Sequence, residues 1–130
     1  MDLGLSGKTA LVTGSGRGIG LTIDRALYTE GCNVALNSRS ELSLQAIAQD
    51  GSDGLSDRSS THVADVTDPK ACQALVQSVI DQWGRLDILV CNVGSGASVP
   101  PGQETPEEWQ RVFKLNLFST THMVETARSV

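Results

Sequence analysis

The chain has 130 residues, of which 39% are hydrophobic and 19% are charged, a composition typical of a globular domain. Its net charge of −5 argues against general affinity for nucleic acid or anionic membranes. No apolar run reaches membrane-spanning length, the N-terminus does not resemble a signal peptide, and the three cysteines form no metal-binding motif. We therefore expect a cytoplasmic protein without a metal site, and structural or surface roles for His62 and His122.

The first elements of the chain form a strand–loop–helix–strand unit. The short apolar run Thr9–Thr13 predicts a buried parallel strand. A glycine-rich loop follows, and a helix is expected from about Gly18 to Glu30, before a second strand over Asn33–Ser38. The length of about 30 residues is that of a βαβ unit.

The glycine-rich loop is the strongest functional signal in the chain. Glycines let a phosphate approach main-chain N–H groups, and the start of the following helix directs its unpaired N–H groups toward the same place. The position between a strand and a helix favours a nucleotide site over a glycine-rich turn without a ligand. The residues expected to contact the nucleotide are Gly14, Ser15, Gly16, Arg17, Gly18, Ile19 and Gly20.

Apolar residues of the first helix recur at helical spacing. Ile19, Ile23, Ala26 and Leu27 fall on one face, which predicts an amphipathic helix.

The remaining elements continue the alternation of strands and helices. Caps mark several helix starts, namely Ser40, Asp68-Pro69 and the capping box Thr105-Pro106-Glu107-Glu108. In chain order we expect a helix after Ser40, a loop over Asp50–Ser60, a strand over Thr61–Ala64, a helix from Asp68-Pro69 to Gly84, a strand over Leu86–Val93, a loop over Gly94–Gln103 and helix over Trp109–Val130.

This order predicts the α/β class: a Rossmann-like parallel sheet of about four βα units, with helices on both faces. Ligands of such sheets bind at the carboxyl ends of the strands, where the strand order reverses. The ends of the predicted strands are therefore the places to look for chemistry.

The end of the second strand reads Asn37-Ser38-Arg39 and carries no acid to bond the ribose hydroxyls of NAD(H). Ser38 and Arg39, with Arg17 in the loop, suit a 2′-phosphate instead, which favours NADP(H) over NAD(H). The alternative is that both arginines are solvated surface charges.

Two further strand ends carry polar residues. The carboxylate of Asp65, which precedes Val66, could accept a hydrogen bond from the adenine amino group, or could simply be an acid in the turn before a helix. At Asn92-Val93-Gly94 a small, polar bend could let the cofactor pass and tie neighbouring strands together.

Together these motifs resemble the short-chain dehydrogenase/reductase family. Thr13–Gly20 is similar to its TGxxxGIG loop, Asp65 to its strand-three acid, and Cys91-Asn92-Val93-Gly94 to an altered form of its NNAG motif. Asn116 matches the asparagine of its active-site helix, and the resemblance implies that this residue helps to hold a water in a proton relay. It also implies a carbonyl–alcohol oxidoreductase that acts on a small molecule and forms a homo-oligomer at full length.

The resemblance stops short of the catalytic centre. The family's catalytic Ser and Tyr-x-x-x-Lys follow the helix that carries Asn116, whereas the single tyrosine here, Tyr28, lies on the first helix and is followed four positions later by Cys32. We therefore expect residues 1–130 to be the N-terminal NAD(P)-binding part of a single domain, inactive alone, with the edge of the fourth strand exposed. The apolar residues Phe113, Leu117 and Val124 should be exposed with it. The alternatives are a non-catalytic nucleotide-binding or regulatory module, complete as written, and a truncated product without function. The substrate cannot be read from the sequence.

Overall fold

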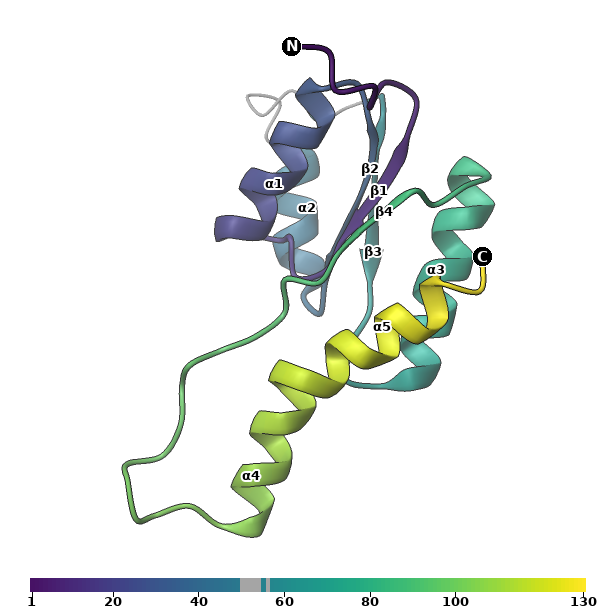
Figure 1. Cartoon of the computed structure of the whole chain (residues 1–130). Coiled ribbons are helices and arrows are strands. Elements are labelled where there is room, and N and C mark those ends of the chain that lie inside the picture. Colours follow the sequence, from purple (N-terminus) through teal and green to yellow (C-terminus); the bar gives the residue numbers. More distant parts are fainter. Residues whose placement is uncertain (50–54, 56) are drawn as a thin grey trace.

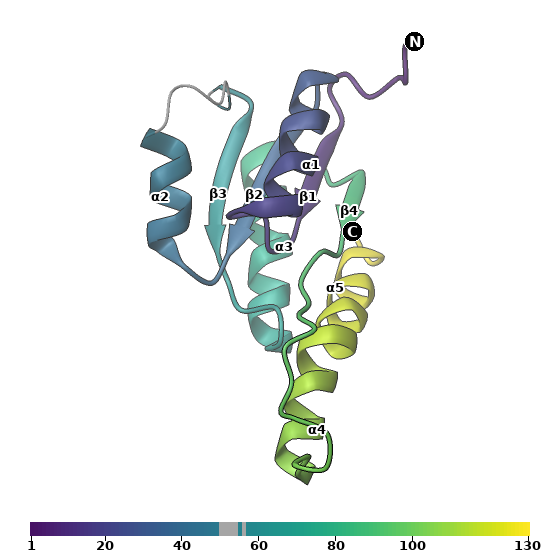
Figure 2. The ribbon, with the colours of Figure 1, turned by 90° about the vertical axis from the view of Figure 1, so that its left-hand side faces the viewer.

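The computed structural model describes residues 1–49, 55 and 57–130, and its centre is one parallel sheet. Figure 2 shows the four strands side by side, in the order β3-β2-β1-β4. Their bounds are β1 Thr9–Val12, β2 Asn33–Ser38, β3 Ser59–Val63 and β4 Ile88–Val90. The first strand, β1, lies inside the sheet. β2 and β3 follow on one side of it, and β4 pairs with the other side of β1. The strand order therefore reverses beside β1, as the sequence predicts for a Rossmann-like sheet.

Helices cover both faces of the sheet, as expected. In Figure 1, α1 and α2 lie on one face and α3 and α5 on the other, while α4 projects away from the body. Their bounds are α1 Gly18–Thr29, α2 Glu41–Gln49, α3 Pro69–Trp83, α4 Pro106–Phe113 and α5 Ser119–Ala127, with a π-helical segment, η2, at Lys114–Phe118.

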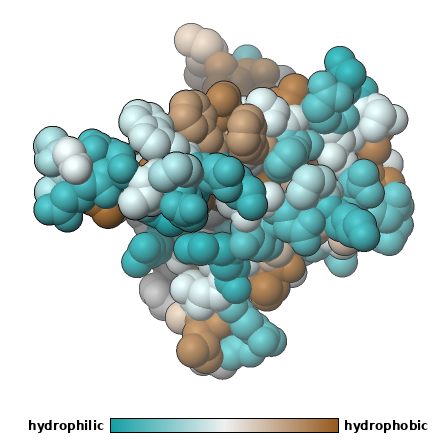
Figure 3. Space-filling view, turned by 90° about the horizontal axis from the view of Figure 1, so that it is seen from below, coloured by the Kyte–Doolittle hydropathy of each residue, from teal (hydrophilic) through white to brown (hydrophobic). Residues whose placement is uncertain are grey.

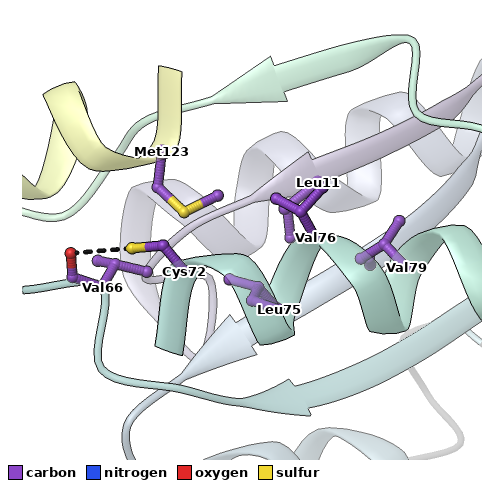
Figure 4. Close-up of a cluster of buried hydrophobic side chains, with 8 residues drawn as sticks. Leu11, Val66, Cys72, Leu75, Val76, Val79 and Met123 are labelled. Carbon is purple, nitrogen blue, oxygen red and sulfur yellow. Dashed lines mark hydrogen bonds between the residues drawn. The ribbon is translucent and has the colours of Figure 1, made fainter. Parts of the chain in front are cut away.

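The larger core cluster lies between the sheet and α3. Leu11 of β1, four residues of α3 and Met123 of α5 are almost fully buried there, and Figure 4 shows their side chains converging. The apolar stripe along α3 is therefore core packing, as its spacing predicts. At one end of this cluster the Cys72 Sγ donates to the Val66 carbonyl (3.3 Å), as Figure 4 shows.

The expected helix caps are present. Ser40 Oγ accepts from Ser43 N (3.3 Å), and Asp68 Oδ1 accepts from Lys70 N (3.0 Å). Thr105 Oγ1 accepts from Glu108 N (3.2 Å). The Glu108 carboxylate binds Arg111 (2.6 Å), a partner that the capping-box pattern does not predict.

Three strands have bounds that differ from the sequence prediction, and β1 and β3 each end one residue early, at Val12 and Val63. β3 begins at Ser59, two residues before the expected Thr61, because β2 continues to pair through Val34 with Ser59. The expected loop over 50–60 is wrong at its last two residues, and residues 50–54 and 56 lie outside the described part. β4 spans only Ile88–Val90, because beyond Val90 the Asn92 N–H turns to the Thr13 hydroxyl (3.0 Å).

The orientation of α1 also differs from the prediction. Ile19 is 75% exposed and Ala26 is exposed, whereas Gly20 and Asp24 are buried against the sheet. A Cβ at Gly20 would lie 2.6 Å from Gly14 O and 2.9 Å from Ser15 Cα. This close backbone contact sets the rotation of α1, so that positions 20 and 24, one turn apart, face inward.

The last helical segment changes its hydrogen-bonding pattern in the middle. The helical pattern expected over Trp109–Val130 is present as far as Ala127, but five residues in the middle adopt π-helical hydrogen bonding. The Asn116 side chain donates to the Val112 carbonyl four residues earlier (3.1 Å), and such a side-chain bond competes with the regular helical ladder.

Large apolar side chains are exposed on this projecting part. Phe113, Leu117 and Val124 are each 45–46% exposed, as the sequence analysis predicts. β4 is the edge strand on the same side of the sheet. None of the described helices has the length and apolar character needed to cross a bilayer.

Candidate functional site

The carboxyl ends of the four parallel strands meet at one edge of the sheet, and a pocket lies there. Figure 3 looks onto this edge from below, where hydrophilic side chains dominate and hydrophobic groups interrupt them. The lining residues come from loops after all four strands and from α1, α2, α4 and η2. They are Gly14, Gly16, Arg17, Gly18, Ile19, Asn37, Ser38, Arg39, Ser40, Ser43, Ala64, Asp65, Val66, Thr67, Asn92, Val93, Gly94, Ser95, Arg111, Lys114 and Leu115.

The glycine-rich loop is tightly packed at Gly20 and open at Gly18. A Cβ at Gly20 would meet the Asn92 amide nitrogen at 2.5 Å as well as the backbone of the loop. A Cβ at Gly18, which has a φ of 59°, would meet nothing within 4 Å, so the space above the helix start is open. The loop therefore presents bare backbone to the pocket.

The N-terminus of α1 faces this open space without a cap. Arg17 is the N-cap residue, its side chain makes no capping hydrogen bond, and the first turn carries no acid. Unpaired N–H groups and the positive end of the helix dipole favour an anion at this place. The residues present therefore fit the pyrophosphate of a dinucleotide.

Asn37 holds the loop in position, although the sequence analysis assigns it no role. Its side chain is 1% exposed and joins three segments: Oδ1 accepts from Gly14 N (3.2 Å), and Nδ2 donates to His62 O and Ala64 O (3.2 Å each). The available signal was a polar residue inside the otherwise apolar run of β2, because a buried amide must find partners.

Ser15 lies beneath the pocket. It is fully buried, its hydroxyl donates to Val12 O (2.9 Å) and accepts from Asn37 N (3.0 Å), and its N–H donates to Asn37 O (2.7 Å). Its side chain is thus occupied in joining β1 to β2. Of the predicted loop residues, Ser15 and Gly20 do not line the pocket but support those that do.

Asn92 ties β4 to the loop, as expected for the bend at this strand end. Its N–H donates to the Thr13 hydroxyl (3.0 Å) and its Nδ2 donates to Gly14 O (3.0 Å). Val93 and Gly94 continue the wall of the pocket.

Charged residues gather at the β2 and β3 ends of the pocket. Arg17 and Arg39 both line it, and so does Asp65. Partial burial acts to raise the pKa of Asp65, but hydrogen bonds from Thr67 and the charge of Arg39 outweigh it and hold the pKa below its usual value. Thr67 N and Oγ1 both donate to Asp65 Oδ1 (3.0 and 2.7 Å), so this acid does shape the turn.

Asn116 borders the pocket from η2 without lining it. Its Oδ1 accepts from Ser95 N (2.8 Å) and its Nδ2 donates to Ser95 O (3.1 Å), so the amide binds the backbone that follows β4. Arg111 donates to Ala97 O (3.1 Å) and fixes the same segment to α4. The segment between β4 and α4 is therefore attached at two points.

The structure thus brings most of the predicted site residues together and adds others. The pocket also contains residues that the sequence did not indicate, because only the fold brings them to the same edge: Asn37, Ser40, Ser43, Thr67, Arg111, Lys114 and Leu115. Within the described residues no group of three or more His, Cys, Asp or Glu could hold a metal ion.

Comparisons with known proteins find relatives that are dehydrogenases. The family model described as short chain dehydrogenase matches residues 8–129. Glucose 1-dehydrogenase 2 of Bacillus subtilis is 37% identical over 122 residues, which cover 89% of this chain and 45% of that protein. Gluconate 5-dehydrogenase of Gluconobacter oxydans is 38% identical over 113 residues, 87% of this chain and 44% of that protein.

A solved structure agrees with the fold as well. The crystal structure of a hydroxysteroid dehydrogenase from Escherichia coli superposes with a TM-score of 0.87 at 28% identity, covering 96% of this chain and 52% of that one. The chain thus spans less than half the length of these two curated relatives.

Proposed function

Because the chain belongs to the short-chain dehydrogenase family, we propose that it forms the NADP(H)-binding part of an oxidoreductase that interconverts a carbonyl and an alcohol. One observation carries the cofactor preference. Arg17 and Arg39 line the same pocket as the uncapped start of α1, and no acid stands at the end of β2. Two guanidinium groups at that position suit a 2′-phosphate, whereas NAD(H) sites usually place a carboxylate there.

Each part of the pocket has a proposed partner in the cofactor. The α1 N-terminus, with Gly14, Gly16, Gly18 and Ile19, binds the pyrophosphate, and Ser38 supports Arg39 at the 2′-phosphate. Thr67 occupies Oδ1 of Asp65, and the other carboxylate oxygen accepts from the adenine amino group, next to Val66. The bend at 92–94 leads the cofactor past β4. When bound, a nicotinamide supplies hydride transfer, and the protein supplies position and electrostatics.

Asn116 is the residue of this chain that we propose to act near the reacting atoms. It fixes the Ser95 backbone at the pocket border (2.8 and 3.1 Å) and, by family resemblance, helps to hold a water of a proton relay. We expect the 130-residue chain alone to show negligible turnover, because it contains no Tyr-x-x-x-Lys. Measurable carbonyl reduction by the homogeneous chain would contradict this assignment.

The remaining parts of the proposal concern the whole protein. We propose that residues 1–130 belong to one domain and that the substrate is a small alcohol or carbonyl compound. The exposed Phe113, Leu117 and Val124 support association into a homo-oligomer. The free thiols of all three cysteines support a reducing compartment such as the cytoplasm.

Titration with NADPH and NADH tests the proposed cofactor. We expect NADPH to bind more tightly, and Arg39→Asp to weaken NADPH binding about 10- to 100-fold, the effect of losing charge-assisted hydrogen bonds. Arg128→Ala is a matched control, because Arg128 pairs with Glu125 on the exposed surface of α5. Tighter binding of NADH by the unchanged protein would refute the NADP(H) preference, and absence of binding by both would refute the cofactor site.

A further inference from the structure

Asp24 is a fully buried carboxyl group that the proposed function leaves without a role. It is 0% exposed, and neither of its oxygens has a hydrogen-bond partner within the described residues. Burial of an acid without a partner is costly, and an ionised one is costlier still. Such a group in a native fold requires an explanation.

The position of Asp24 connects it to the cofactor loop. It lies on the buried face of α1, one helical turn after Gly20, and Gly20 is packed directly on the loop backbone at Gly14 and Ser15. The nearby Ser15 hydroxyl gives its only proton to Val12 O (2.9 Å), so it does not neutralise a charge on Asp24. The carboxyl therefore lies one helical turn from the residue that packs on the loop proposed to bind the pyrophosphate.

The described surroundings of Asp24 supply no compensating charge. The strands on which α1 packs, β1 and β2, carry no ionisable side chain, and neither does β4. The buried Cys32 thiol precedes β2 on the same side of the sheet. The ionisable residues of α1 and its caps are Arg17, Arg25, Tyr28 and Glu30. None of these acts on the pKa of Asp24, which burial raises to about 7 against a smaller lowering by Ser15.

We propose that Asp24 is a positioning residue that couples cofactor binding to the uptake of one proton. A neutral Asp24 leaves the positive end of α1 and the Ser15 bond to Val12 intact, and this form binds the anionic cofactor. An ionised Asp24 places a negative charge beneath the phosphates and competes for the Ser15 proton, so it opposes binding. The proton comes from solvent and stays on the carboxyl while the cofactor is bound. This inference rests on the proposed function.

The size of the coupling follows from the geometry. One helical turn of about 5.4 Å plus a hydrogen bond of about 3 Å separates the carboxyl from a bound phosphate. Unit charges about 8 Å apart at an effective dielectric constant of about 20 change the dissociation constant by roughly 30-fold. Screening by water at the open pocket reduces this, and we expect an effect of about tenfold.

The test compares the pH dependence of cofactor binding in matched variants. For the unchanged protein we expect the NADPH dissociation constant to rise about tenfold from about pH 6.5 to about pH 9, and for Asp24→Asn to rise less than about threefold. Asp81→Asn, an exposed acid on α3 that accepts from Gln77 (2.8 Å), should keep the dependence of the unchanged protein. Titration of the cofactor's own phosphate is common to all three and cancels in the comparison.

A second measurement needs no variant. Calorimetry of NADPH binding near pH 7.5, in buffers with different heats of ionisation, should report uptake of about half a proton, which is the most that a tenfold coupling at one site produces. Binding without proton uptake, or with the same pH dependence in the unchanged protein and Asp24→Asn, overturns the role of Asp24 and leaves the proposed function standing. Absence of NADPH binding at every pH overturns the proposed function and this inference with it.

Discussion

Replacing Asp24 by asparagine should make the free energy of unfolding less dependent on pH. In the folded protein the carboxyl is fully buried and has no hydrogen-bond partner among the residues that the structure describes, and burial raises its pKa from the ordinary value of 3.8 to about 7. In the unfolded chain the same group is solvated. The folded state therefore retains a proton that the unfolded state releases at neutral pH.

The sign of the effect follows from this difference. Below about pH 4 both states are protonated, and Asp24 costs the folded state no ionisation energy. As pH rises toward 7 the unfolded state ionises first, so the folded state loses relative stability, and the loss is complete above the folded pKa. A difference of about 3 pKa units corresponds to about 4 kcal/mol of lost stability at alkaline pH.

Urea unfolding of the unchanged protein and Asp24→Asn at several pH values between about 4.5 and 8.5 measures this loss. The useful quantity is how the difference in free energy of unfolding between the two proteins changes with pH. The part of this difference that does not depend on pH includes the cost of burying an amide. We expect Asp24→Asn to gain most of about 4 kcal/mol relative to the unchanged protein across this range. A difference that stays constant within about 0.5 kcal/mol would refute the ionisation argument.

Three further predictions concern the loop and β3. Gly20→Ala should destabilise the fold by about 1–3 kcal/mol and weaken NADPH binding, because its Cβ meets backbone at 2.6 and 2.9 Å, whereas Gly96→Ala, with nothing within 4 Å, should change neither. Equal unfolding midpoints for the two variants would contradict the packing argument. Asn37→Leu should cost about 2–4 kcal/mol in urea unfolding, because it leaves Gly14 N and two carbonyl groups unpaired, and a loss below about 1 kcal/mol would count against this role. Burial lowers the pKa of His62. The stability that this neutral ring contributes above about pH 6.5 should therefore be lost as pH falls through the lowered pKa. A His62→Gln variant that loses as much stability between about pH 7.5 and 5 as the unchanged protein would disprove this role of His62.

The His62 prediction also rests on a hydrogen-bond chain that assigns the tautomer. Ser78 Oγ donates to Leu75 O (2.8 Å), so His62 Nδ1 must donate to Ser78 (2.9 Å). Trp83 Nε1 donates to Ser60 Oγ (3.1 Å), which leaves the Ser60 proton for His62 Nε2 (2.8 Å). A neutral ring satisfies every partner, and this agrees with the structural role expected from the sequence.

Local features of the fold could be read directly from the sequence because each depends on residues a few positions apart. Asp68, Pro69 and Gly84 mark the ends of α3 through contacts within one helical turn, and the structure confirms all three. The strand–loop–helix pattern around Gly14–Gly20 likewise predicts the uncapped helix start that we propose as the phosphate site, because the unpaired N–H groups belong to the helix itself.

Other features depend on contacts between distant residues, and only the tertiary structure decided them. Asn37 reaches Gly14 across 23 positions and Asn92 reaches Gly14 across 78, so no local pattern could place either amide on the loop. Because Gly20 packs closely on that loop, α1 is rotated so that Asp24 is buried and Ile19, a residue of the predicted apolar stripe, is exposed. The sequence by itself determined which backbone could bind a nucleotide. The tertiary structure decided which side chains hold that backbone, because their partners come together only when four strand ends meet at one edge.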